Sequence, residues 1–351
     1  MHYLHKTNCA IFHQQPLITK TADMALQHTF RHWLAATFCL LLGSSSIAQS
    51  KPGTSSKIDS SLNYLYQRGL FNGVVLLAEN GKVVYQKALG NKGADSNVPV
   101  DTRSSFNLAS LSKQFTAMMV LMLKEEGKLR FDDPVQTHLP LFPYPGISIR
   151  NLLTHTSGLE EYFGLALKYR NTLDTFTNEK LLQLLHEYAP PLRFDPGSKW
   201  EYSNTGYIVL GSLIEKLSGM RIEEFFAKKI TGPLQLKNTF IHYLNMQQHH
   251  PLSDSRVLGM ERKNGHFTAN DLIRIDGVVG DGNVYASAED LLKWDQALYS
   301  GKLISSKTLE EAFRPVRLNN GSTHDYGFGW AIQDSGSTVM HSGSWVGFRT
   351  Y

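Results

Sequence analysis

The stretch Asn107-Leu-Ala-Ser-Leu-Ser-Lys-Gln-Phe-Thr-Ala-Met-Met-Val120 decides the fold, because a chemically capable polar pair precedes an apolar helical run. Residues three apart share one face of an α-helix, so the amine of Lys113 can reach the hydroxyl of Ser110. A serine becomes an effective nucleophile at neutral pH only when a neighbour takes its proton. Lys113 can take it if burial or nearby positive charge favours its neutral form. Ser110 and Lys113 are therefore candidate catalytic residues, against the alternative of a solvated surface pair.

The composition is that of a globular protein with a large core. The chain has 351 residues, of which 42% are hydrophobic and 19% are charged. The formal net charge is only +4, and no run or stripe of basic residues occurs. These features give no support to nucleic-acid binding, and nothing in the sequence indicates an obligate protein partner.

The N-terminal region resembles a targeting segment. A basic residue, Arg31, precedes the apolar stretch 33–42, and small residues follow as far as Ala48. This pattern is typical of a secretory signal peptide that ends near Ala48, so we expect an exported protein, periplasmic or secreted. Two alternatives stay open: an uncleaved membrane anchor, and a true start at Met24.

Cysteine usage limits the chemistry of the predicted mature chain. Cys9 and Cys39 both precede the expected cleavage site, so neither a cysteine nucleophile nor a thiolate metal site is expected after it. No His-Glu-x-x-His or comparable cluster occurs. We therefore predict no metal and no cofactor.

Local patterns predict strands at both ends of a helical segment. Residues 73–79 and 82–88 flank Asn80-Gly81, which is a strong β-hairpin signal. The other predicted elements are helices over 58–70, 114–127, 149–153, 179–186, 207–217, 223–230 and 291–299, the last opened by a capping box at 287–290, and strands over 280–286, 326–332 and 338–340. We interpret 1–48 as extension and signal peptide, 49–109 with 280–351 as a discontinuous sheet domain, and 110–279 as a mainly helical domain with the site at the interface.

Two further motifs are candidates for the same site. Tyr202-Ser-Asn204 lies between a Pro-Gly turn and a helix start, where side chains can project into a cleft. The alternative is a tyrosine that packs its ring and an asparagine that caps the next helix. His341-Ser-Gly343-Ser344 follows a predicted strand, and glycine there lets a ligand or another backbone approach closely.

The order Ser-x-x-Lys, Tyr-x-Asn, His-x-Gly resembles that of the serine β-lactamase and penicillin-binding protein superfamily, most of all its class C β-lactamase and DD-carboxypeptidase-like branch. The segments 149–159, 282–291 and 326–330 also look like family signatures. The resemblance runs from about residue 58 to the end of the chain. It implies an α/β fold of the α+β type, with an antiparallel sheet flanked by helices and a mainly helical inserted domain.

The resemblance also implies roles for individual residues. Ser110 would attack a carbonyl and form an acyl-enzyme, while Lys113 accepts or shuttles its proton and Tyr202 acts as partner base. Asn204 would orient Lys113 and the substrate amide, and the backbone N–H groups of Ser110 and Ser344 would bind the oxyanion. Which of Lys113 and Tyr202 is the base stays open.

Two departures from the family pattern affect these expectations. His341 stands where β-lactamases of the family have lysine, and a neutral imidazole attracts a substrate carboxylate less strongly than a fixed cation does. Family members also usually continue through further strands and a C-terminal helix, so we expect these elements to be missing here.

The sequence therefore predicts an exported serine hydrolase that acts on D-amino acid peptides, β-lactams or small esters, with peptidoglycan as one candidate source of substrate. The alternative is a weak or inactive penicillin-binding or cell-wall-binding module on the same fold.

Overall fold

The computed structural model describes residues 9–10, 52–168, 175–244 and 253–351. The predicted signal peptide falls almost wholly outside these residues. No helix within the described ranges is long and apolar enough to cross a bilayer.

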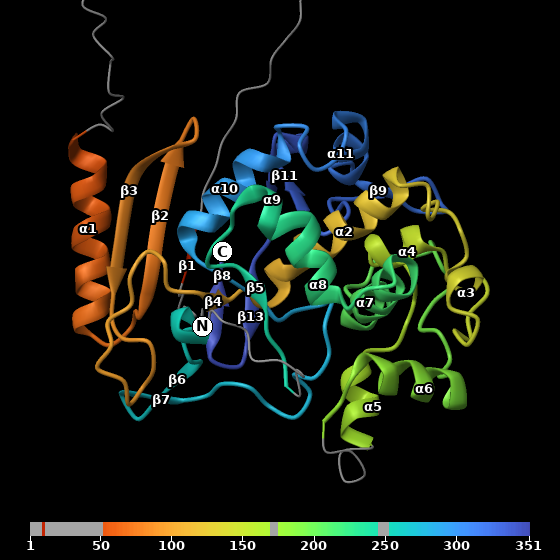
Figure 1. Cartoon of the computed structure of the whole chain (residues 1–351), viewed down its shortest axis with the longest axis horizontal. Coiled ribbons are helices and arrows are strands. Elements are labelled where there is room, and N and C mark those ends of the chain that lie inside the picture. The colour runs from red at the N-terminus through yellow and green to blue at the C-terminus, as the bar shows by residue number, and fades with distance from the viewer. Residues whose placement is uncertain (1–8, 11–51, 169–174, 245–252) are drawn as a thin grey trace, which may run out of the picture.

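A five-stranded sheet forms one side of the molecule, in the order β13-β14-β1-β2-β3 (Figure 1). Its strands are β13 (Gly343–Trp345), β14 (Phe348–Thr350), β1 (Cys9–Ala10), β2 (Gly73–Glu79) and β3 (Lys82–Leu89). The hairpin predicted at Asn80-Gly81 is confirmed, since β2 and β3 pair antiparallel from Gly73 opposite Leu89 to Glu79 opposite Lys82. The sheet departs from the predicted antiparallel pattern only at β1, which runs parallel to both neighbours.

Helices cover the sheet and build the other half of the molecule. α1 (Pro52–Gln67) packs along β3 at the outer edge, and α10 (Ala288–Leu298) packs against β2. Ser287 caps α10 by accepting a hydrogen bond from the Asp290 N–H, which is one half of the predicted capping box. The Asp290 carboxylate accepts instead from the Asn238 N–H, the Thr239 hydroxyl and Lys293. The remaining helices are α2 (Lys113–Glu125), α3 (Val135–His138), α4 (Ile149–Leu153), α5 (Tyr162–Lys168), α6 (Asn178–Tyr188), α7 (Asn204–Ser218), α8 (Ile222–Phe226), α9 (Gly232–Leu234) and α11 (Ser306–Ala312).

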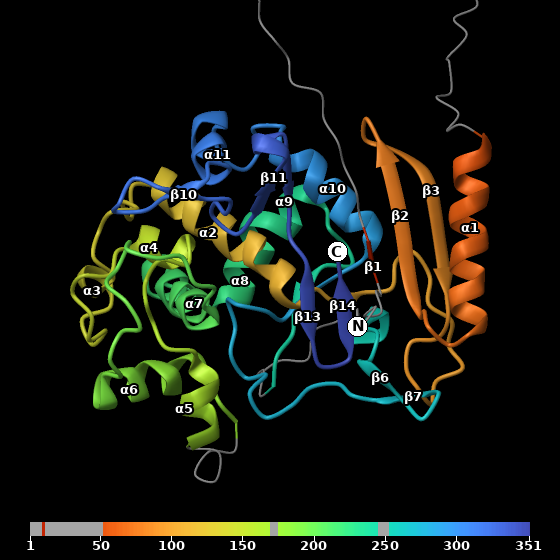
Figure 2. The ribbon, with the colours of Figure 1, turned by 180° about the vertical axis from the view of Figure 1, so that it is seen from behind.

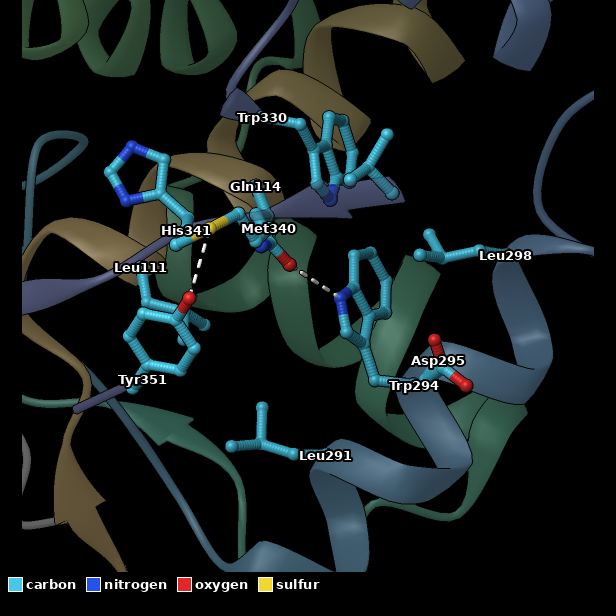
Figure 3. A pocket seen from close by; sticks show the side chains of 11 residues that line it. Leu111, Gln114, Leu291, Trp294, Asp295, Leu298, Trp330, Met340, His341 and Tyr351 are labelled. Carbon is cyan, nitrogen blue, oxygen red and sulfur yellow. Dashed lines mark hydrogen bonds between the residues drawn. The ribbon is translucent and has the colours of Figure 1, made fainter. Parts of the chain in front are cut away.

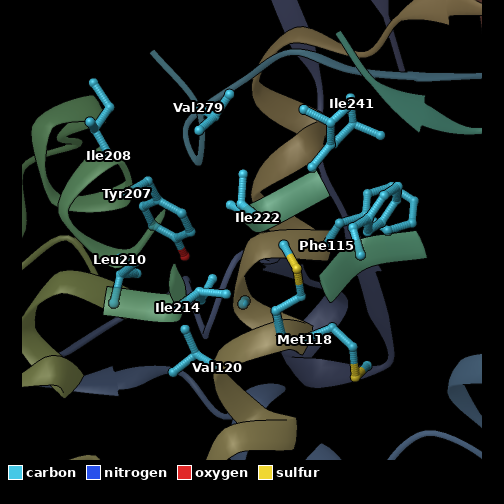
Figure 4. Close-up of a cluster of buried hydrophobic side chains, with 14 of the residues drawn as sticks. Phe115, Met118, Val120, Tyr207, Ile208, Leu210, Ile214, Ile222, Ile241 and Val279 are labelled. Atoms are coloured by element: carbon cyan, nitrogen blue, oxygen red, sulfur yellow. The ribbon is translucent and has the colours of Figure 1, made fainter. Parts of the chain in front are cut away.

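The core forms where α7 packs against α2, α4, α6 and α8 (Figure 4). Phe115, Met118 and Val120 from α2 and Tyr207 and Ile214 from α7 all contribute buried side chains to this core. In α2 every residue from Lys113 to Leu123 is buried, so the helix is enclosed on all sides rather than lying on the surface. This burial fixes the position of its first turn, which carries Lys113.

Small sheets complete the fold. β4 (Phe106–Asn107), β8 (Val284–Ala286) and β5 (Phe240–Ile241) form a three-stranded sheet that leads into the segment at Ser110. The two-stranded pairs are β6 (Met260–Lys263) with β7 (His266–Ala269), β9 (Val316–Arg317) with β10 (Thr323–His324), and β11 (Ala331–Gln333) with β12 (Thr338–Met340). The long strand predicted over 280–286 is confined to β8, and that over 326–332 is reduced to the start of β11 and one bridge from Tyr326 to Ala331.

The placement of β13 connects the two halves of the molecule. Figure 2 shows β13 and β14 between the β2–β3 hairpin and α2. β13 contacts the turn that carries Ser110. The Ser-x-x-Lys and His-x-Gly motifs therefore lie side by side where the sheet meets the helices.

Candidate active site

Ser110 lies on a 3₁₀ turn, Ala109–Ser112, rather than on the α-helix that the sequence analysis assumed. α2 begins only at Lys113. In a 3₁₀ turn residues three apart are eclipsed, so Ser110 and Lys113 still share a face. Ala109 has φ of 49°, a left-handed conformation that is unusual for alanine, and its N–H donates to Asn107 Oδ1 at 2.8 Å. The segment that carries the nucleophile is thus held in a strained conformation.

The Lys113 amine is completely buried and has three acceptors. Its Nζ lies 3.3 Å from Ser110 Oγ, 2.8 Å from Asn204 Oδ1 and 2.8 Å from the Asp281 carbonyl oxygen. An ammonium group has three donors, so this arrangement satisfies it fully. The serine and lysine motif and the Tyr-x-Asn motif are therefore brought together through a single nitrogen atom.

Asn204 is positioned by Glu161, which the sequence analysis did not identify. The Asn204 backbone N–H donates to Glu161 Oε1 at 2.6 Å, and Nδ2 donates to Oε2 at 3.2 Å. These contacts leave Oδ1 to accept from Lys113. Ser203, not Asn204, caps α7 by accepting from the Gly206 N–H, which rules out the capping alternative for Asn204. Burial raises the pKa of the Glu161 carboxyl group.

Tyr202 lies between Lys113 and a buried imidazole. Its ring centroid is 4.8 Å from Lys113 Nζ and 4.3 Å from the centroid of His155. Its hydroxyl is buried and has no hydrogen-bond partner among the described residues. His155 Nδ1 accepts from the Ser203 N–H, and burial together with the nearby charge of Lys113 holds the pKa of His155 well below its usual value. A neutral imidazole therefore supports the tyrosine ring.

His341 is placed behind the site rather than in its cavity. Its Nε2 lies 2.9 Å from the Tyr326 hydroxyl, and its Nδ1 lies 2.7 Å from the Ser342 carbonyl oxygen. Nδ1 must donate to that carbonyl, so neutral Nε2 accepts from Tyr326. Burial and the charge of Lys113 lower the pKa of His341 to about 4. The side chain lines a separate pocket between α2, α10 and β12, with a volume of about 90 Å³ (Figure 3).

Gly343 permits the close approach of β13 to the nucleophile turn. A Cβ atom there would lie 2.0 Å from the Leu108 carbonyl oxygen and 2.3 Å from Thr350 Oγ1. The Thr350 hydroxyl also donates to the Leu108 carbonyl at 2.8 Å, which ties β14 to the same turn. Ser344, the next residue along β13, is thereby held beside Ser110.

These groups share one cavity of about 340 Å³. Ser110, Tyr202, Asn204 and Ser344 all line it. Its other lining residues are Ala109, Tyr162, Phe163, Asp276, Val278, Asp281, Gly282, Asn283 and Trp345. Burial raises the pKa of the Asp281 carboxyl group to about 6, and the positive charge of Lys113 opposes this shift. No cluster suited to a metal ion occurs in the part of the chain that the structure describes.

The groups that meet in this cavity are those that acyl transfer to a serine requires. It combines a hydroxyl nucleophile, an amine and a phenol beside it, and backbone N–H groups on two adjoining elements. The sequence patterns identified Ser110, Lys113, Tyr202, Asn204 and Ser344. They did not identify Glu161, whose contact with Asn204 joins residues 43 apart in the sequence.

Comparisons with known proteins agree with this geometry. The sequence model of the family described as Beta-lactamase matches residues 57–351. Penicillin-binding protein 4* of Bacillus subtilis (strain 168) is 39% identical over 300 residues, which cover 82% of this chain and 66% of that protein. D-aminopeptidase of Brucella anthropi is 25% identical over 285 residues, which cover 79% of this chain and 52% of that enzyme. The chain thus spans between half and two thirds of these relatives.

A solved structure gives the same result for the fold. The penicillin-binding protein of Bacillus halodurans superposes with a TM-score of 0.64 at 26% identity, over 75% of this chain and 80% of that one.

Proposed function

The chain belongs to the Beta-lactamase family, and we propose that it is a serine hydrolase that forms an acyl-enzyme on Ser110 with amide or ester substrates. The observation that carries the proposal is the triple contact of the buried Lys113 Nζ with Ser110, Asn204 and the Asp281 backbone. Burial of an amine beside a serine hydroxyl carries a desolvation penalty for its charged form, and buried ionisable groups of this kind are concentrated at functional sites. Strain at Ala109 points to the same segment.

The proposed reaction has two halves. Ser110 Oγ attacks the substrate carbonyl carbon, and its proton passes to a free base in the site, either Lys113 as the neutral amine or Tyr202 as the phenolate. The oxyanion is stabilised by the backbone N–H groups of Ser110 and Ser344. The tetrahedral intermediate then expels the amine or alcohol, which takes the proton. Water, activated by the same base, attacks the acyl-enzyme and releases the acid together with free Ser110.

The neutral state of His341 favours particular substrates. Because its pKa is lowered to about 4, it provides no cation at neutral pH for a substrate carboxylate. We therefore expect esters and amides without a free carboxylate near the scissile bond to be turned over better than penicillins. D-amino acid peptides derived from peptidoglycan remain candidate substrates, since the relatives that match include a D-aminopeptidase and a penicillin-binding protein.

One experiment separates a hydrolase from a binding module. The protein and its Ser110→Ala variant are incubated with p-nitrophenyl acetate and with a fluorescent penicillin, and product release and labelling are followed. The proposal predicts ester turnover that the variant loses. A stable adduct without release supports the binding module, and turnover that is independent of Ser110 excludes both.

We also propose that the chain is exported. The support is the basic residue and apolar stretch ahead of Ala48. Expression of the full chain in a bacterium, followed by fractionation and intact-mass measurement, tests this. The expected product is an extracytoplasmic chain that begins near Gln49. A full-length chain in the cytoplasm contradicts the proposal.

A further inference from the structure

An aromatic row forms one wall of the cavity at Ser110. Trp345 from β13 and Phe163 from α5 are stacked, with ring centroids 5.8 Å apart and planes at 23°. Phe163 in turn lies 4.4 Å from Tyr162, whose ring is 5.9 Å from that of Phe176. Tyr162 and Phe176 are buried, whereas Phe163 and Trp345 are only partly covered. The row therefore runs from the interior to an open aromatic surface at the cavity.

A buried carboxylate fixes the outer ring of this row. The indole N–H of Trp345 donates to Asp276 Oδ1 at 2.6 Å, and Asp276 Oδ2 accepts from the Ile273 N–H at 2.6 Å. Asp276 is 2% exposed, so its carboxylate is shielded from solvent and is hydrogen-bonded to these two protein groups. The orientation of Trp345 is thus set by a partner 69 residues away, and not by local packing alone.

Trp345 is also the neighbour of Ser344, whose backbone N–H is an expected oxyanion donor. A group attached to the acyl carbon of a substrate bound at Ser110 therefore lies within reach of this wall. Stacking of an aromatic group against these rings gives binding free energy beyond that expected from the buried area alone. Because Trp345 is already held in place, it loses little conformational entropy when a substrate binds.

Resting on the proposed function, we propose that Trp345 and Phe163 determine acyl specificity, and that the preferred acyl donors carry an aromatic or flat apolar side chain. Asp276 acts as a positioning residue for Trp345. Ser110 and Asn204 line the same cavity as these two rings.

The test uses substrates with a small leaving group, so that the aromatic ring can only be on the acyl side. The two substrates are the S-ethyl thioester of acetic acid and the S-ethyl thioester of phenylacetic acid. Their turnover is compared by release of ethanethiol, and each enzymatic rate is normalised to the uncatalysed hydrolysis of the same thioester. We expect kcat/KM to favour the phenylacetyl substrate roughly tenfold or more. Trp345→Leu and Phe163→Leu should each remove most of this preference, while Trp345→Phe should retain part of it.

Tyr64→Leu is the matched control, because Tyr64 is an exposed aromatic residue on α1, which packs along β3 at the edge of the sheet opposite β13. It should leave the preference unchanged. Thermal unfolding of each variant shows whether it folds, and Phe163→Leu carries the test if Trp345→Leu does not. An equal kcat/KM for both substrates, or a preference that survives both leucine variants, overturns the inference. If the parent protein shows no Ser110-dependent turnover of either substrate, the proposed function itself is refuted.

Discussion

Gly343→Ala should reduce catalysis more than it reduces stability. The added Cβ would lie 2.0 Å from the Leu108 carbonyl oxygen, about 1.4 Å inside the 3.4 Å limit of ordinary contact. The hydrogen bond from Thr350 to the same carbonyl ties the turn to β14, so β13 must move away from Ser110. Such a shift displaces the Ser344 N–H from the oxyanion.

The magnitude follows from these contacts. Loss of one oxyanion donor lowers kcat by about 10²- to 10³-fold, and KM should change little because the donor acts mainly in the transition state. Overpacking of this kind costs roughly 1–3 kcal/mol of stability, which a domain of this size can tolerate.

The assay is ester hydrolysis under saturating substrate, with thermal unfolding measured in parallel. Gly146→Ala is the control, because its Cβ would have no atom within 4 Å and Gly146 does not have a positive φ. A folded Gly343→Ala protein with kcat within about twofold of the parent would refute the reasoning.

Four further outcomes are expected. Lys113→Met should lower kcat by about 10²- to 10⁴-fold, because the variant lacks the amine that transfers the proton. The circular dichroism spectrum should stay that of the folded protein, because an apolar side chain replaces a buried cation. A loss of kcat below tenfold would contradict a role in proton transfer. Tyr202→Phe should change the free energy of unfolding by less than about 1 kcal/mol, since the hydroxyl has no partner among the described residues, while turnover falls; unchanged turnover would remove Tyr202 from the mechanism. Glu161→Gln should cost about 1–3 kcal/mol in urea unfolding, because its amide opposes Asn204 Nδ2, and a neutral effect would show that this contact is unimportant. Burial raises the pKa of Asp276 from 3.8 to about 6, so its contribution to stability is lost as pH rises from about 4 to about 6. Relative to the parent, Asp276→Asn should therefore gain up to about 3 kcal/mol between pH 4 and pH 7, and a pH-independent difference would show that the carboxyl group titrates normally.

Elements defined by local patterns were predictable from the sequence. The hairpin at Asn80-Gly81 and the helix over 149–153 were identified because turn chemistry and apolar periodicity act over a few residues. The same signal, Asn264-Gly265, joins β6 to β7, and that hairpin could have been predicted too. The β13–β14 hairpin has strands of three residues, which is too short for a periodic pattern.

The site was predictable only in its short motifs. Ser110 and Lys113 are three residues apart, and Tyr202 and Asn204 two, so spacing reveals them. Glu161 contacts Asn204 across 43 residues, and no local pattern encodes such a pairing. The position of His341 likewise depends on Tyr326 from another segment. The domain boundaries at 109 and 279 stay a prediction.

The most direct test of the account is the location of the covalent adduct. The protein is quenched in acid during turnover of a slow ester or after reaction with a penicillin, digested, and mapped by mass spectrometry. The account predicts one acyl group, on the peptide that contains Ser110, and none in Ser110→Ala. Acylation of a different residue, or turnover with no acylated intermediate under any substrate tested, would contradict it.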